Sequence, residues 1–165
     1  MENDYIKNIA FEQLIYNPNT GIFTWSVSRR GVRAGNVAGT KEKTGYRKIM
    51  LDRRFYGSHR LAWLFIYGEW PNGIIDHIDG DPSNNVATNL RISNTSLNAA
   101  NKKTPVTNTS GFKGVSLVKS TGKWYAYIKV NGKTKSLGFY DDPKIAHNSY
   151  TNAARQYFGE HARSK

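Results

Sequence analysis

The chain has 165 residues and a formal net charge of +12, from 24 Lys and Arg against 12 acidic residues. Its 38% apolar and 13% aromatic content argues against a fully disordered chain and allows one ordinary domain or two small ones. The absence of cysteine excludes disulfides and Cys-based zinc sites, so a metal would need oxygen or nitrogen ligands. No apolar run approaches the roughly 18 residues of a membrane span, and the acidic N-terminus lacks a signal-peptide profile. We therefore expect a cytoplasmic protein.

The basic excess favours a polyanionic partner, because Lys and Arg that neutralise phosphates release condensed counterions. A soluble protein that is merely basic is the alternative. Residues 108–165 hold 10 basic and 3 acidic side chains, a net charge of +7, and are more basic per residue than the rest of the chain.

In the first half of the chain, residues 1–10 indicate a polar arm and residues 11–16 a short helix. The sequence Asn17-Pro18-Asn19-Thr20-Gly21 is typical of a turn and precedes a predicted strand over 22–27. A basic loop is predicted over 28–45, with one short strand near Val37, and a hairpin over 46–56. A helix follows over 59–67 and ends near Gly68. The remaining predicted elements are a strand over 74–77, a loop over 79–88, a strand over 90–92, and a helix over 94–102 with Ser93 as its N-cap.

A polar stretch over 104–110 predicts a linker between a domain over 1–103 and a domain over 111–165. In the second domain the patterns predict three antiparallel strands, over 112–118, 124–130 and 133–139, and a helix from Pro143 to Gly159 with Asp142 as its N-cap. Asn131-Gly132 is typical of a type I′ hairpin turn. The chain is thus predicted to be an α+β protein whose last domain is a three-stranded sheet packed on one helix.

The residues with the clearest chemistry follow a short apolar run, where Asp76 and His77 are adjacent. A neutral histidine can accept a proton from water near neutral pH, because its reference pKa is about 6.5. A Mg²⁺ ion needs one or two carboxylates, with phosphate oxygens and waters completing its shell. With Asn89 and Asn98 downstream, this inventory suits hydrolysis of phosphodiesters at a single metal.

The segments Gly57-Ser58-His59-Arg60-Leu61-Ala62-Trp63, Asp76-His77-Ile78-Asp79-Gly80-Asp81, Asn84-Asn85, Asn89-Leu90-Arg91 and Asn98 resemble the HNH endonuclease family, in its phage and intron homing-endonuclease branch. The resemblance implies a strand hairpin and a helix around one divalent metal, most simply Mg²⁺ with Mn²⁺ as an alternative. It implies that His77 is the general base, that Asp76 is a metal ligand, and that Asn89 orients the imidazole of His77. Asn98 stands at the last ligand position, where many members have histidine.

Several of these residues have simpler explanations. Asp79, Gly80, Asp81, Asn84 and Asn85 are ordinary turn formers. His59 opens a predicted helix, so packing or a phosphate contact is expected of it rather than a role as base. For Arg60 and Arg91, contacts with phosphates and pairing with nearby acids both remain open.

The segments Phe112-Lys113-Gly114-Val115, Gly122-Lys123-Trp124-Tyr125-Ala126-Tyr127-Ile128, Leu137-Gly138-Phe139-Tyr140 and Ala146 with Ala153-Ala154 resemble the APETALA2-type DNA-binding domain. This resemblance implies that the sheet face opposite the helix lies in the major groove. The residues expected on that face are Lys113, Ser116, Val118, Tyr125, Tyr127, Lys129, Thr134 and Ser136. Because the face lacks arginine, moderate sequence preference and strong salt dependence are expected. A solvated basic face is the alternative.

Together these features predict a monomeric, site-directed, metal-dependent endonuclease that nicks or cuts double-stranded DNA, encoded by a mobile element of a bacteriophage or bacterium. One rival is a non-catalytic DNA-binding regulator that keeps a nuclease fold. Another is a structural RNA-binding protein, although the paired aromatic signature of common single-strand RNA readers is missing.

Overall fold

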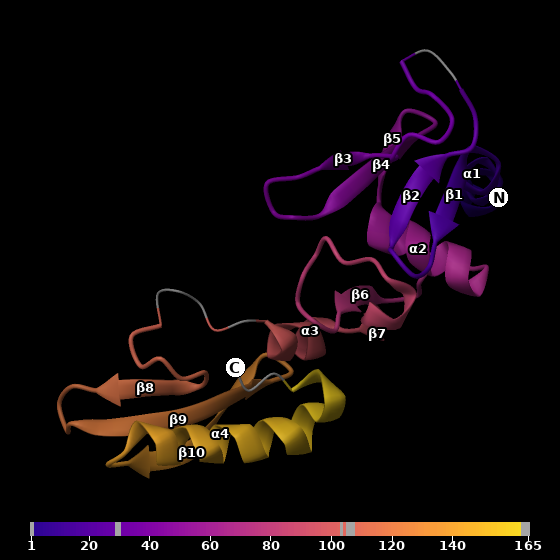
Figure 1. The fold of residues 1–165 in the computed structure, drawn as a ribbon. Coiled ribbons are helices and arrows are strands. Elements are labelled where there is room, and N and C mark those ends of the chain that lie inside the picture. The colour runs from indigo at the N-terminus through magenta and orange to yellow at the C-terminus, as the bar shows by residue number, and fades with distance from the viewer. Residues whose placement is uncertain (1, 29–30, 103, 105–107, 163–165) are drawn as a thin grey trace. The chain divides into compact units, whose positions relative to one another are not determined.

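The computed structural model describes residues 2–28, 31–102, 104 and 108–162. The chain divides into two compact units, 1–93 and 94–165, which mix helices with small sheets as an α+β protein does (Figure 1). Among the described residues, no helix combines the length and the apolar character that crossing a membrane requires.

The division falls earlier than the sequence patterns placed it. The helix that follows Ser93 belongs to the second unit, because its apolar Leu97 and Ala100 pack in the core of that unit. Residues 103 and 105–107, around the expected linker, lie outside the described residues.

The described part of the first unit contains one three-stranded sheet, two two-stranded hairpins and two α-helices. Its elements are α1 (Glu2–Gln13), β1 (Leu14–Asn17), β2 (Ile22–Trp25), β3 (Thr40–Lys41), β4 (Arg47–Leu51), β5 (Arg54–Gly57), α2 (Ser58–Tyr67), β6 (Ile74–His77), the 3-10 turn η1 (Ala87–Asn89) and β7 (Leu90–Ser93). The sheets are antiparallel, with orders β1-β2, β3-β4-β5 and β6-β7. Val37 forms one isolated bridge, to Thr24.

Two predictions near the N-terminus are wrong. The expected polar arm is helix α1, which buries Ile6 and Ala10 one turn apart. Of the expected helix over 11–16, only residues 11–13 are helical, as the end of α1; strand β1 follows, in which Leu14 is paired with Trp25 and Tyr16 with Phe23. Pairing across the turn therefore overrides the local apolar spacing.

The core of the first unit lies around α2, which packs against β4 and β5 and against α1. Phe23, Ile49, Leu51, Leu61 and Leu64 are fully buried there. Helix α2 ends as predicted at Gly68, which takes the left-handed conformation (φ 75°) and donates its N–H to the carbonyl of Leu64.

The second unit is a three-stranded antiparallel sheet with helix α4 against one face (Figure 1). Its elements are α3 (Thr95–Asn101), β8 (Val115–Val118), β9 (Lys123–Val130), β10 (Lys133–Tyr140), α4 (Pro143–Phe158) and the 3-10 turn η2 (Gly159–His161), with strand order β10-β9-β8. The predicted hairpin turn is confirmed by positive φ at Asn131 (49°) and Gly132 (80°). The predicted cap of α4 is confirmed as well, because Asp142 accepts from the N–H groups of Lys144 and Ile145.

A glycine in the β1–β2 turn lies directly against the loop that follows β6. Gly21 has a φ of +69°, and a Cβ there would lie 2.4 Å from the carbonyl carbon of Asn85 and 2.5 Å from the nitrogen of Val86. Because backbone atoms cannot move aside as a side-chain tip can, the two segments pack this closely only with glycine.

We predict that Gly21→Ala destabilises the protein more than Gly35→Ala. Gly35 also has positive φ (+85°) but nothing within 4 Å of its Cβ position, so it should lose only the backbone term of about 1–2 kcal/mol. Gly21→Ala adds overpacking, typically about 1–3 kcal/mol. Urea denaturation measures both, and equal losses would show that the close packing at Gly21 is not rigid.

Candidate active site

The hairpin β6–β7 carries two buried polar residues side by side. Asp76 and His77 are each 4% exposed. Because successive residues of a strand point to opposite faces, the two side chains have different neighbours. In the hairpin register Asp76 is opposite Arg91, and His77 is opposite Leu90.

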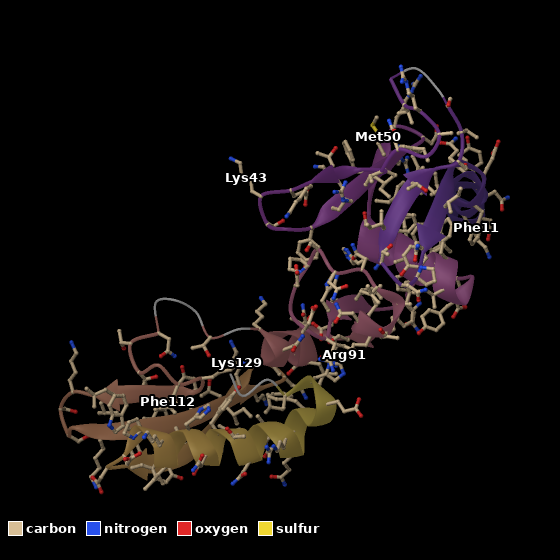
Figure 2. All side chains as sticks on the ribbon, viewed as in Figure 1. Phe11, Lys43, Met50, Arg91, Phe112 and Lys129 are labelled. Atoms are coloured by element: carbon tan, nitrogen blue, oxygen red, sulfur yellow. The ribbon has the colours of Figure 1, made fainter. Side chains whose placement is uncertain are left out.

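The carboxylate of Asp76 is paired with the guanidinium of Arg91. The Nε and Nη2 atoms of Arg91 both donate to Oδ2 of Asp76, at 3.0 and 2.9 Å. The position of Arg91 is labelled in Figure 2. Of the two roles left open for Arg91, the structure therefore shows pairing with a nearby acid, Asp76. The guanidinium balances a carboxylate that burial would otherwise disfavour.

The imidazole of His77 is held by Asn85. Nε2 of His77 lies 3.1 Å from Oδ1 of Asn85, whose Nδ2 donates to the carbonyl of Ser83 at 3.5 Å. An amide oxygen only accepts hydrogen bonds, so Nε2 of the neutral ring carries the proton and the ring's lone pair is on Nδ1. Asn85 is itself 3% exposed, and its carbonyl accepts from the hydroxyl of Tyr16 at 2.7 Å.

The expected contact between Asn89 and the imidazole is replaced by a different one. The amide nitrogen of Asn89 donates to Oδ1 of Asp79 at 3.0 Å and to the carbonyl of Asn84 at 2.8 Å, and its oxygen accepts from the N–H of Asp79. Asn89 therefore closes the loop that carries Asn85 and acts on His77 only through that loop. Sequence reasoning missed Asn85 because Asn-Asn pairs are common in turns.

Asp79 contributes to the same loop as an ionised carboxylate. Partial burial acts to raise its pKa, but hydrogen bonds from the Asp81 N–H and from the amides of Asn84 and Asn89 outweigh it and lower the pKa. The carboxylate thus remains an acceptor for these groups at neutral pH, which keeps the loop closed.

His59 lies beside the candidate base, a position that the sequence did not reveal. Its ring centroid is 5.7 Å from that of His77 and 5.3 Å from that of Tyr46. Burial, with His77 and Arg60 as nearby charges, lowers the pKa of His59 to about 4, so it is neutral at neutral pH. Gly57 makes room for this ring, since a Cβ there would lie 2.6 Å from Cε1 of His59.

Arg60 and Asn98 are two further candidate residues from the sequence. The guanidinium of Arg60 donates to the carbonyls of Gly73 and Pro71, at 3.3 and 3.4 Å, and so ties α2 to the start of β6. Asn98 lies on α3 in the second unit, and its role as a metal ligand stays a prediction. Helix α3 is capped by Asn94 rather than by the predicted Ser93, because the Asn94 side chain accepts from the N–H groups of Ser96 and Leu97.

The donors near the hairpin fit a hard divalent metal better than a soft one. Among the described residues no group of three His, Cys, Asp or Glu forms a metal cage. Mg²⁺ does not need one, because it binds through one or two carboxylates and keeps waters and phosphate oxygens. Asp76 is a buried carboxylate of this kind, and its role as a metal ligand stays a prediction.

The second unit presents an aromatic and polar sheet face opposite α4. The ring of Tyr125 stacks on Tyr127, with centroids 5.6 Å apart, and on Phe139, with centroids 4.9 Å apart. The other predicted residues that share this face in the strand register are Ser116, Val118, Lys129, Thr134 and Ser136, with Lys129 labelled in Figure 2.

Phe139 was missed on this face, although it is 57% exposed. The pairing of β10 with β9 shifts between Ser136 and Gly138, so Ser136 and Phe139 share a face despite their odd spacing. Lys113 was wrongly placed on the face. Its ammonium group donates to the carbonyls of Ala100 and Lys102 at the end of α3.

Comparison with known proteins agrees with this site. Residues 56–100, from β5 through most of α3, match the HNH endonuclease family. Protein 3.8 of Escherichia phage T7 is 35% identical over 115 residues, which cover 67% of this chain and 94% of that protein. The chain belongs to the Protein 3.8 family and carries an HNH endonuclease domain.

A second relative of the chain is an uncharacterized HNH endonuclease of Acanthamoeba polyphaga mimivirus, 33% identical over 122 residues. Those residues cover 73% of this chain and 62% of the mimivirus protein. No solved structure gives a significant match. The HNH match and this viral relative suggest a nuclease, and they confirm the HNH part of the sequence prediction.

We predict that Asn85→Ala changes the tautomer of His77. In the parent protein the amide oxygen selects the form protonated at Nε2, and its loss should give a mixture of both neutral tautomers. Long-range ¹H–¹⁵N correlation spectra distinguish these forms. His147, which contacts the carbonyl of Lys113 in the second unit, is the internal control and should not change. An unaltered His77 spectrum would mean that another group sets the tautomer.

Proposed function

We propose that this protein is a metal-dependent endonuclease that hydrolyses phosphodiester bonds in double-stranded DNA. The observation that carries the proposal is the adjacency of a buried carboxylate, Asp76, and a buried imidazole, His77, on one strand of the HNH match. The HNH family and the viral relative support a nuclease, and the charge of +12 favours a phosphate polymer as substrate.

His77 is the general base in this proposal. Its Nδ1 takes a proton from the attacking water, while Nε2–H stays bonded to Asn85. The same amide oxygen stabilises the imidazolium that forms, because both ring nitrogens of a protonated histidine are donors. The neutral neighbour His59 adds no positive charge that would oppose this proton transfer.

Asp76 would be a ligand of one divalent cation, Mg²⁺ or Mn²⁺, which when bound neutralises charge on the phosphate and on the leaving 3′-oxygen. One such site per chain favours nicking by a monomer, and cutting both strands would take two events or two copies. The phage relative supports a phage-encoded protein that acts in the cytoplasm of a bacterial host.

The second unit is proposed to hold the duplex, as the APETALA2 resemblance implies. A strand ribbon fits the major groove, and the hydroxyls of Tyr125, Tyr127, Thr134 and Ser136 are donors and acceptors for base edges. Lys129 provides a point charge for phosphate. The net charge of +7 over residues 108–165 supports this role.

The deciding experiment compares the parent protein with His77→Ala on phage and plasmid duplex DNA, with Mg²⁺ and with EDTA. We expect metal-dependent strand scission by the parent and a loss of at least about a hundredfold in His77→Ala, the usual range for a general base. DNA binding should persist in the variant.

Asn152→Ala, on the exposed side of α4, is the matched surface control and should cut like the parent. Binding without any metal-dependent scission, across several substrates, would favour the alternative of a non-catalytic DNA-binding regulator. Tighter binding to RNA than to duplex DNA would favour the RNA-binding alternative.

Duplex binding by the sheet face predicts different effects for two lysines of the same sheet. Lys129→Ala should weaken binding and reduce the slope of log affinity against log salt by about 1, because one phosphate contact is lost. Lys135→Ala is the control, since Lys135 donates to the hydroxyl of Tyr157 on the helix side. Fluorescence anisotropy across a salt series measures both, and equal slopes for the two variants would contradict the assignment of the face.

A further inference from the structure

The buried pair of Asp76 and Arg91 links the proposed metal ligand to a second charged group. The two residues are directly opposite each other in the β6–β7 register. Two N–H groups of Arg91 converge on the single oxygen Oδ2, and the side chains are 4% and 15% exposed. Asp76 is therefore already occupied by a cation of the protein itself.

A divalent cation on the same carboxylate would meet this guanidinium at close range. Both are positive, and their repulsion is strong because little water separates charges at a buried site. A metal ion that binds Asp76 is therefore opposed by Arg91, and moving the guanidinium away from Oδ2 relieves the repulsion. The HNH match contains both residues but does not assign this relation.

The guanidinium has a suitable second partner in the proposed reaction. Its planar set of N–H donors fits a phosphate group as well as a carboxylate, often through two parallel hydrogen bonds. A DNA phosphate held near the metal carries the negative charge that Arg91 would lose on leaving Asp76. The exchange keeps each charge paired when metal and DNA arrive together.

We propose that Arg91 is an exchangeable counter-ion, which holds Asp76 in the metal-free protein and transfers to the DNA phosphate when a divalent cation takes the carboxylate. This inference rests on the proposed function. Its consequence is that metal and DNA bind cooperatively, since each removes an obstacle to the other. Metal alone binds weakly, so the site is assembled mainly on DNA.

The test measures Mn²⁺ binding by electron paramagnetic resonance. All variants are made in a His77→Ala background, which is expected not to cleave the DNA. Without DNA, the Arg91→Met variant should bind Mn²⁺ about tenfold more tightly than the His77→Ala protein that keeps Arg91, which is a coupling free energy of ordinary size. A short duplex of random sequence should increase the Mn²⁺ affinity of the protein that keeps Arg91. It should increase the Mn²⁺ affinity of the Arg91→Met variant much less. Mn²⁺ binding that is equal or weaker in Arg91→Met, with the same response to duplex, would overturn the exchange.

Arg91→Met leaves a buried carboxylate unpaired, so its folding is checked by thermal unfolding. Mn²⁺ should raise its melting temperature more than that of the parent. Arg91→Lys keeps one positive charge without the planar fork and provides a second variant, whose Mn²⁺ affinity without DNA should lie between the other two. An affinity equal to that of the parent in a folded Arg91→Lys would count against the proposal.

Asp76→Asn separates failure of this inference from failure of the proposed function. It should abolish Mn²⁺ binding by the protein in every background, after the Mn²⁺ bound by the duplex alone is subtracted. If Mn²⁺ binding depends on Asp76 but does not change when Arg91 is replaced, only the proposed transfer of Arg91 to the phosphate is wrong. If no Mn²⁺ binding depends on Asp76, with or without duplex, the metal site of the proposed function is wrong as well.

Discussion

The candidate active site depends on the burial of Asn85 where three segments of the chain meet. Its side chain accepts from His77, its carbonyl accepts from Tyr16, and its backbone lies against Gly21. A two-stranded hairpin such as β6–β7 is at best marginally stable alone. The β1–β2 turn and the loop closed by Asn89 supply the support that the hairpin lacks, and through Asn85 they fix one ring orientation of His77.

Charge at the site is balanced by the side chains of the protein itself. Asp76 is neutralised by Arg91, and His59 remains neutral beside His77 because burial lowers its pKa to about 4. A buried ion pair contributes little net stability, since desolvation offsets the attraction between the charges. The pair is better understood as keeping a carboxylate ready at a protected position. The proposed function requires this, because both the proposed metal and the proposed substrate are charged.

The two units divide the proposed work between chemistry and binding. The first holds the proposed base and one proposed metal ligand on strand β6, and the second carries the larger positive charge for its length. On the outer sheet face, Tyr125 is stacked on both Tyr127 and Phe139, so its own ring edge and hydroxyl rather than its ring faces are available to a ligand. Such a surface suits hydrogen bonding in a groove more than stacking on unpaired bases.

Local patterns were sufficient for the features that depend on a few neighbouring residues. The turn at Asn131-Gly132, the cap at Asp142, the end of α2 at Gly68 and the strand carrying Asp76 and His77 all follow from the backbone preferences and hydrogen-bonding groups of the residues themselves. Other features required segments far apart in the chain to meet. Asn85 rather than Asn89 holds His77 because the loop folds back under Tyr16. Phe139 joins the sheet face because a bulge changes the alternation of β10, and Lys113 leaves it to cap α3. Spacing along a sequence carries no record of such contacts, because they depend on how whole elements pack.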